Sequence, residues 1–400
     1  MNRLLEAHKR DSQAYGALTS LPTFGFHRFI RLHPDDEKRH RESFERYKDI
    51  PQFFYPAAME FDIESYHTEI QLLKERLPDL VDHRVVLHLY LRKLTELEKR
   101  AELIYAVQQK NDAGVTRLSV DLYGEQTSRA TDYAREFAEM LEGRSVFHEH
   151  SRPIDATRFK KMVEVLFLHY GITTWDVYLH SGSSLRVKRG RGRGRILVPK
   201  QLQISRARAA RLLTHEIEVH VLRALAGEQS PLHLLSRGLD QYLITEEGLA
   251  VWAQMQMHDA KPNHAPGFWD AWACALANEG NFLHVYHTLR EARRSIHEKL
   301  RRPDADERAK DAAWRLCMRV YRGIHHPHHA RLGYQRDHLY RTGLKQIEDY
   351  LDGAENQMAA LRKLYVGKIG IEHIDLINEL GIAPSITSEF ISRDVVESFF

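Results

Sequence analysis

The chain contains 400 residues, of which 43% are hydrophobic and 10% aromatic, so it can bury a substantial core in one large domain or in a few smaller ones. Lys and Arg number 58 against 55 Asp and Glu, and a formal charge of +3 gives no reason to expect nucleic acid or another polyanion as a partner. Two cysteines are too few for a disulfide framework or a thiolate metal site, and no apolar run has the length of a signal-peptide core or a membrane-spanning helix. We therefore expect a cytoplasmic globular protein that acts away from membranes.

The first 165 residues are predicted to form a helical region. Apolar residues recur at intervals of three and four in "MEFDIESYHTEIQLLKERLP" and "DHRVVLHLYLRKLTELEKRAELIYAVQQK", residues 59–78 and 82–110, and this spacing is typical of amphipathic helices. Pro78 is expected to separate the two helices, because proline removes a backbone donor and ends or kinks a helix. The sequence thus indicates an N-terminal helical region, residues 1–165.

A short β-rich segment follows this region. Thr, Val, Tyr, Ile and Leu occur in short runs between Gly and Ser, which predicts strands at residues 173–180, 184–189 and 194–199. The basic run "KRGRGRGR", residues 188–195, lies between two of these strands. We interpret it as the tip of a hairpin, with a phosphate-binding patch as the alternative.

Ser205 begins the next amphipathic run, which extends through Leu225. Ser205 is a favoured N-cap residue, and Gly227 stands where the C-cap of this helix is expected. The helix therefore directly follows a predicted strand. Beyond Thr245 the pattern is helical again to the end of the chain, apart from a Gly- and His-rich loop at residues 323–333.

The helix after the strands carries "RLLTHEIEVH", in which His215 and His220 are five residues apart. On a straight α-helix each residue turns the chain by about 100°, so side chains five apart point about 140° away from each other. A π-bulge has a wider i→i+5 turn that would bring both rings onto one face, and such bulges occur mostly at functional sites. If both histidines bind one metal ion, the helix must depart from regular α geometry between Thr214 and His220.

The residue types in this motif fit a zinc hydrolase. Such an enzyme needs three protein ligands, an open position for water and a carboxylate that accepts the proton of that water. His215 and His220 would supply two nitrogen ligands. Glu216, directly after the first histidine, would serve as the general base, as the glutamate of an HExxH helix does.

A third ligand is available in "LITEEGLA", about thirty residues downstream. Thr245 is the expected N-cap of a helix there, and Glu246 and Glu247 would lie in the first turn, where the helix dipole favours carboxylates. Gly248 would let this helix approach the motif helix closely. One carboxylate is enough for the metal, and the other could accept a hydrogen bond from a ligand histidine.

The runs "LLTHEIEVHVLRALAG" and "SPLHLLSRGLDQYLITEEGLA" resemble the family that contains the microtubule-associated tyrosine carboxypeptidase and bacterial proteins named for a QEGLA motif. The segments "FGFHRFIRLHPDDEKRHRESFERYKDIPQFFYP", "VDLYG", "YQRDHLYRTGL" and "GKIGIEHIDLINEL" are also similar, so the resemblance covers roughly residues 20–385. The family resembles zincins, which implies a Zn²⁺ site with His215, His220 and Glu247 as ligands and Glu216 as base. Glu246 takes the place of the glutamine in the QEGLA motif.

We therefore predict a predominantly helical, zincin-like α+β protein with a small β-sheet next to the HExxxH helix and a catalytic region at residues 166–400. Its expected function is that of a zinc-dependent metallopeptidase, a carboxypeptidase that removes the C-terminal residue of a peptide or protein. Such an enzyme needs a cation for the terminal carboxylate, and an arginine fork suits that group best. The resemblance suggests Arg322 in "VYRG" and Arg336 in "YQRD" for this role. Tyr321 or Tyr340 could donate a hydrogen bond to the oxyanion.

Two other functions are open from the sequence. The chain could be a non-enzymatic regulator of gene expression, since the bacterial family name concerns modulation of flavohaemoglobin expression. It could also be a zinc amidohydrolase on a small-molecule substrate, because that reaction uses the same water. The complete ligand set with Glu216 beside it favours an enzyme, since a binding module needs no base next to its metal.

Two further patterns have simple structural interpretations. The string "HHPHH", residues 325–329, could bind a second metal ion. Pro327 interrupts it and no carboxylate flanks it in the sequence, so a solvated loop is favoured. Arg223, which follows the motif, is expected to pair with a neighbouring carboxylate such as Glu218.

Overall fold

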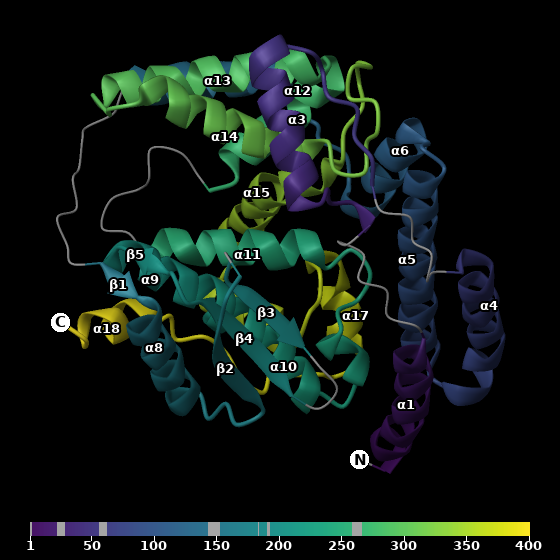
Figure 1. The fold of residues 1–400 in the computed structure, drawn as a ribbon. Coiled ribbons are helices and arrows are strands. Elements are labelled where there is room, and N and C mark those ends of the chain that lie inside the picture. Colours follow the sequence, from purple (N-terminus) through teal and green to yellow (C-terminus); the bar gives the residue numbers. More distant parts are fainter. Residues whose placement is uncertain are drawn as a thin grey trace. The chain divides into compact units, whose positions relative to one another are not determined.

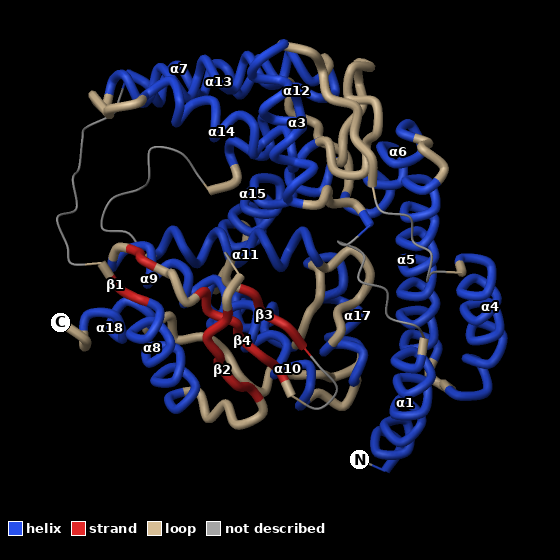
Figure 2. The backbone as a smooth tube through the Cα atoms, viewed as in Figure 1, coloured by secondary structure: helices blue, strands red, loops and turns tan. Residues whose placement is uncertain are grey.

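The computed structural model describes residues 2–21, 29–55, 62–142, 153–182, 184–189, 193–257 and 266–400. Helices, blue in Figure 2, make up most of this part of the chain, and the strands form two small sheets. The architecture is therefore α+β and mostly helical, as the sequence predicts. None of the described helices is both long enough and apolar enough to cross a membrane.

The chain divides into two compact units, and each unit is assembled from separate stretches of sequence. Unit 1 comprises Met1–Arg144, Leu239–Ile244 and Pro266–Gly343, and unit 2 comprises Ser145–Gly238, Thr245–Ala265 and Leu344–Phe400. This division differs from a single boundary near residue 165. Tertiary packing, and not order along the chain, decides which helices share a core.

All described secondary structure of unit 1 is helical. Its helices are α1 (Asn2–Ser20), α3 (Pro34–Tyr47), α4 (Ile63–Leu80), α5 (Arg84–Gln108), α6 (Asp112–Tyr123), α7 (Ala130–Glu142), α12 (Phe268–Glu279), α13 (Phe282–Lys299), α14 (Ala305–Val320) and the 3₁₀ turn η3 (Gln335–His338). Two further helices, α11 (Leu243–Gln256) and α15 (Leu339–Asp352), begin in this unit. Helices α13 and α14 lie along each other (Figure 1). The core is aromatic: the ring centroid of Phe44 is 4.7 Å from that of Tyr286.

Unit 2 contains all the described strands. These are β1 (Ile154–Asp155), β2 (Trp175–His180), β3 (Arg186–Arg189), β4 (Gly194–Pro199) and β5 (Gln203–Ile204). Its helices are α8 (Ala156–His169), α9 (Arg206–Leu213), the π-helix η1 (Thr214–Val221), α10 (Leu222–Gln229), α16 (Gln357–Lys363), α17 (Ile374–Glu379), α18 (Ser392–Glu397) and most of α11 and α15. Short 3₁₀ turns occur at η2 (His233–Ser236), η4 (Leu364–Val366) and η5 (Ile371–His373).

The larger sheet has the strand order β2–β4–β3, with β4 parallel to β2 and antiparallel to β3. Alternate residues of the central strand, Ile196 and Val198, are buried, and α8 packs against β2 and β4 (Figure 1). Gly194 begins β4 beside Trp175. A Cβ atom on Gly194 would lie 2.0 Å from the indole ring, so only glycine fits there.

The three predicted strands are confirmed. The third has the predicted bounds, 194–199, and the first two begin two residues later than expected, at residues 175 and 186. The antiparallel pairing of β3 with β4 agrees with a basic hairpin. Its tip, residues 190–192, lies outside the described residues.

The predicted N-cap of the motif helix is confirmed, whereas its predicted C-cap is wrong. The Ser205 side chain accepts a hydrogen bond from the backbone N–H of Arg208. Gly227 lies inside α10, which continues to Gln229. Glycine is needed there for a close approach, because a Cβ atom would lie 2.5 Å from the backbone carbonyl of Leu235.

Two other predicted helix boundaries are also wrong. Thr245 is not an N-cap, because α11 already begins at Leu243, and the Thr245 hydroxyl instead accepts a hydrogen bond of 3.0 Å from the N–H of Ile371. Pro78 lies inside α4, which ends two residues later at Leu80. Only the last turn of that helix follows the proline, so few backbone hydrogen bonds are affected.

Candidate metal centre

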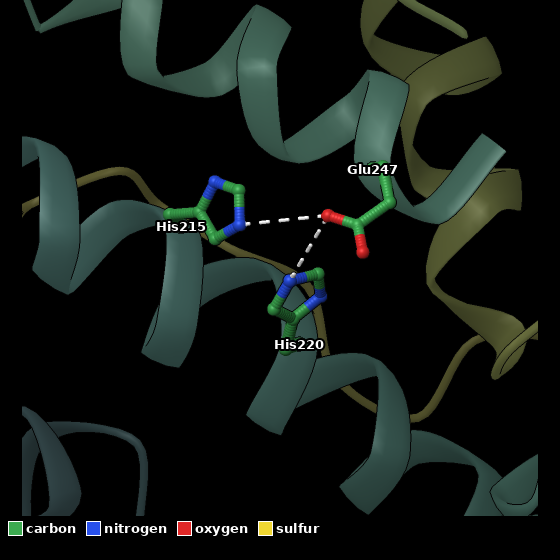
Figure 3. A group of neighbouring side chains, drawn as sticks. All are labelled: His215, His220 and Glu247. Carbon is green, nitrogen blue, oxygen red and sulfur yellow. Dashed lines mark ion pairs between the residues drawn. The ribbon is translucent and has the colours of Figure 1, made fainter. Parts of the chain in front are cut away.

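The two motif histidines face each other on a π-helical turn. The segment η1, Thr214–Val221, lies between α9 and α10, which adjoin it in sequence. Its wider turn brings residues five apart onto one side, and the ring centroids of His215 and His220 are 4.7 Å apart (Figure 3). The predicted departure from α geometry between Thr214 and His220 is confirmed.

Glu247 on α11 completes a group of three potential ligands. Its Oε2 atom lies 3.7 Å from Nε2 of His215 and 3.8 Å from Nε2 of His220 (Figure 3). Within the described part of the chain, no other set of three such side chains brings its ligand atoms within 4.8 Å of one another. Ligands about 2.0–2.1 Å from a tetrahedral zinc ion are about 3.3 Å apart, so a small inward shift of these side chains would fit the ion.

Glu246, the neighbour of Glu247, contacts the Nδ1 nitrogen of His220, whereas Glu247 lies near the Nε2 nitrogen of the same ring. The Glu246 Oε1 atom lies 2.9 Å from Nδ1 of His220. Burial disfavours the charged ring, but the hydrogen bond and the charge of Glu246 outweigh burial and raise the pKa of His220. A proton held on Nδ1 leaves Nε2 as the nitrogen for a metal ion. The two glutamates thus differ: Glu247 faces the cluster and Glu246 orients a histidine.

The Glu246 carboxylate is itself held by two cations. Arg223 of α10 and Lys368 both form ion pairs with it, and Arg223 is wholly buried. Burial would raise the pKa of Glu246, but the charges of Lys368 and Arg223 outweigh burial and hold the pKa well below its usual range. Arg223 pairs with a carboxylate as expected, but its partner is Glu246 and not the suggested Glu218. The Arg223 side chain also donates to two backbone carbonyls of segment 364–369.

His215 has a corresponding partner, Gln254, on α11. The Nδ1 atom of His215 lies 2.7 Å from the side-chain amide nitrogen of Gln254. A flip of that amide presents its oxygen to an Nδ1–H, the arrangement that leaves Nε2 for a metal ion. Burial and the proximity of His220 lower the pKa of His215 to about 4, so the ring is neutral at neutral pH, the form that binds metals.

Sequence reasoning missed both Gln254 and Lys368. Gln254 follows Glu247 by seven residues, two turns along the same face of α11, and this spacing could have identified it. Lys368 is separated from Glu246 by more than a hundred residues. No local pattern marks it as a partner.

Glu216, the expected base, lies directly after His215 in η1. Its side chain is partly exposed, whereas its neighbours Ile217 and Glu218 are buried. The negative charge of Glu216 favours the protonated form of His220, and it partly opposes the burial that lowers the pKa of His215. This placement is compatible with a base that acts on water at the cluster.

The side chains expected to bind substrate lie in unit 1, whereas the cluster lies in unit 2. Arg322 and Arg336 approach the buried carboxylate of Asp337, with N–O distances of 3.6 and 3.3 Å, and Arg319 lies closer, at 2.8 Å. Burial would raise the pKa of Asp337, but the three arginines outweigh burial and lower it. The Tyr340 ring centroid is 6.0 Å from the guanidinium carbon of Arg319. A role of these residues in binding substrate stays a prediction.

The His-rich loop is anchored by an acid that is distant in the sequence. Asp112, at the start of α6, accepts hydrogen bonds from the backbone N–H groups of His325 (2.7 Å) and His326 (2.9 Å), and it lies 3.0 Å from Nδ1 of His326. His325 is buried. Residues 328–330 are exposed, as expected for a solvated loop, whereas His325 is buried and His326 is partly buried because folding brings Asp112 to them. Among the described side chains, Asp112, His325 and His326 do not form a group whose ligand atoms all lie within 4.8 Å of one another.

Comparison with known proteins adds an independent finding. A family model described as microtubule-associated tyrosine carboxypeptidase matches residues 42–388, which is most of the chain and includes all three members of the cluster. No match is found among curated proteins.

Proposed function

The chain belongs to the microtubule-associated tyrosine carboxypeptidase family, and from this premise we propose that it is a zinc-dependent carboxypeptidase acting on the C-terminus of a peptide or protein. The proposed zinc ligands are His215, His220 and Glu247. The observation that carries the proposal is the convergence of two imidazole Nε2 atoms on one carboxylate oxygen. Two histidines and a glutamate are a known donor set of catalytic zinc sites.

The surroundings of the cluster support a zincin-type site. A zinc ion bound there would lower the pKa of a water ligand toward about 7 and polarise a carbonyl group. Glu246 and Gln254 would keep the two imidazoles oriented, each through its Nδ1 atom. Because His215 is neutral at neutral pH, it need not lose a proton to bind the ion.

In this proposal Glu216 is the general base. Its carboxylate would take a proton from the attacking water and then pass that proton to the amine of the leaving group. Arg322 or Arg336 would pair with the terminal carboxylate of the substrate, and Tyr340 would donate a hydrogen bond to the oxyanion. These roles follow from side-chain chemistry and from the family resemblance.

Metal analysis and peptide profiling test the proposal. The purified protein should contain one equivalent of zinc, and mass spectrometry of a peptide mixture should show loss of C-terminal residues. Glu216→Gln is the matched control, because it preserves the shape of the side chain and the ligand set but removes the base. It should retain zinc and lose hydrolysis.

Blocked substrates separate the carboxypeptidase from the alternatives. Loss of one charge-assisted hydrogen bond to the terminal carboxylate costs on the order of 2–3 kcal/mol, or about 30- to 160-fold in rate, so a C-terminal amide should be cleaved much more slowly than the free acid. Equal cleavage of acid and amide would favour an endopeptidase or an amidohydrolase. Bound zinc with no hydrolysis of any peptide or small amide would favour a non-enzymatic regulator.

A further inference from the structure

The side chain of Glu218 connects the π-helical turn η1 to the C-terminal segment, residues 390–400. Glu218 lies inside η1, two residues before His220, and is wholly buried. Five donors reach its carboxylate: the hydroxyls of Tyr170 (2.7 Å) and Thr214 (3.2 Å), the backbone N–H of Ile391 (2.8 Å), and the backbone N–H (3.3 Å) and hydroxyl of Ser392. Three of these donors belong to the start of α18, so the carboxylate links the histidine-bearing turn to residues near the end of the chain.

The backbone of the same turn is held by a second segment, residues 364–369. The Tyr365 hydroxyl donates a hydrogen bond of 2.9 Å to the carbonyl oxygen of Glu218. Arg223 donates to two backbone carbonyls of this segment at 2.8 and 2.6 Å. A π-turn is rare within an α-helix. The hydrogen bonds from Tyr365 and from Ile391 stabilise this turn from outside the helix.

The C-terminal segment also contacts the helices on either side of the cluster. The Phe390 ring packs edge to face on Trp252 of α11, the helix that carries Glu247, with centroids 6.0 Å apart. The guanidinium carbon of Arg206 on α9, which leads into η1, is 3.6 Å from the ring centroid of Phe400. Helix α18 lies beside α8 and α9 (Figure 1). One segment thus contacts both ligand-bearing parts of unit 2.

We propose that Glu218 and Tyr365 are positioning residues that hold η1 in its π form and, through residues 390–392, set its separation from α11. The proposal rests on the proposed function, because it takes the cluster to be a zinc site. Its physical basis is that the two histidines face each other only in π geometry, whereas a regular α-helix would turn them about 140° apart. Loss of these contacts should weaken zinc binding although every ligand remains.

The first test compares two tyrosine variants. Tyr365→Phe removes one hydroxyl and keeps the ring. Tyr350→Phe is the matched control, because the Tyr350 hydroxyl also donates to a backbone carbonyl in unit 2, that of Ala360, at 3.3 Å. Competition with a chromogenic chelator should show zinc affinity about 10- to 100-fold weaker in Tyr365→Phe, the range observed when groups that orient metal ligands are removed. The affinity of Tyr350→Phe should stay within about twofold of the wild type, well inside that range.

The second test uses Glu218→Gln, with Glu379→Gln at an exposed position of α17 as its control. The glutamine amide would place an N–H donor against the donors that now bind the carboxylate. The variant should therefore loosen the turn, although the side chain keeps its volume. Hydrogen–deuterium exchange of the metal-free protein should become faster in residues 214–221 than in the rest of unit 2. The rise in Tm caused by zinc should also be smaller than in the wild type, which a general loss of stability would not produce.

The outcomes separate this proposal from the proposed function. The positioning proposal would be overturned if Tyr365→Phe and Glu218→Gln left both the zinc affinity and the exchange of residues 214–221 unchanged. It would also be overturned if Tyr350→Phe lost as much zinc affinity as Tyr365→Phe. If Glu218→Gln does not fold, Tyr365→Phe decides alone. If the wild type binds no zinc while exchange of the turn still rises in the variants, the positioning role stands and the zinc function falls.

Discussion

Replacement of Glu246 by alanine is expected to destabilise the fold of unit 2 as well as to loosen the metal site. The Glu246 carboxylate is 2% exposed and pairs with Arg223, which is wholly buried, and with Lys368. It is the only carboxylate that pairs with Arg223 among the described residues. Alanine would leave a buried guanidinium without its counter-ion.

The size of the effect follows from this burial. Removal of one partner of a buried ion pair costs about 3–5 kcal/mol, because the other charge stays desolvated and uncompensated. Each kcal/mol lowers Tm by about 2–4 °C in a domain of 150–250 residues, so a fall of about 6–20 °C is expected. Glu246→Gln keeps the shape and an acceptor oxygen, so it should lie between alanine and the wild type.

The assay is thermal unfolding followed by circular dichroism in the presence of a chelator, so that metal binding does not contribute to Tm. Glu379→Ala, at the exposed position of α17, should change stability by less than about 0.5 kcal/mol. A Tm of Glu246→Ala equal to that of Glu379→Ala would refute the reasoning. It would show that Arg223 needs no counter-ion, and that its bonds to backbone carbonyls suffice.

The other predictions concern the ligands and the pH dependence. Glu247→Ala should lose its zinc on gel filtration, and full retention would reassign the third ligand. Gln254→Ala should lower zinc affinity about 10- to 100-fold through His215; unchanged affinity in chelator competition would remove Gln254 from the site. The pKa of Glu246 is lowered from 4.5 in the folded state, so this group stabilises the fold above about pH 4.5 and less as the pH falls. The urea midpoint of the wild type should therefore fall more steeply in acid than that of Glu246→Gln, and parallel curves would contradict the assigned pKa. Arg336→Ala should erase the preference for free acid over amide if this arginine binds the terminal carboxylate.

Several features of the protein could be predicted from the sequence because they depend on local geometry. The five-residue spacing of His215 and His220 predicts a π-turn if both rings are to face one metal ion, since the rotation per residue is a property of the helix itself. The strands could be located because short runs of apolar and β-branched residues are separated by Gly and Ser. The cap at Ser205 could be predicted because the side chain bonds to a backbone N–H three residues away.

Helix ends and partners of buried groups depended on the tertiary structure. Gly227 has the sequence pattern of a C-cap, yet its role is to let the Leu235 backbone approach. The partner of Arg223 is Glu246, and not Glu218, which is closer in sequence. Glu218 instead binds residues near the end of the chain.

The physical reason is the same in each of these cases. A buried polar group must find a hydrogen-bonding partner, but local conformational preferences do not specify which of several compatible groups will supply it. That choice is made when distant segments pack, as when Lys368 reaches Glu246 or Asp112 reaches His326. Spacing along the chain thus determined that the two histidines could share a metal ion, and packing of unit 2 decided that Glu247 faces both rings.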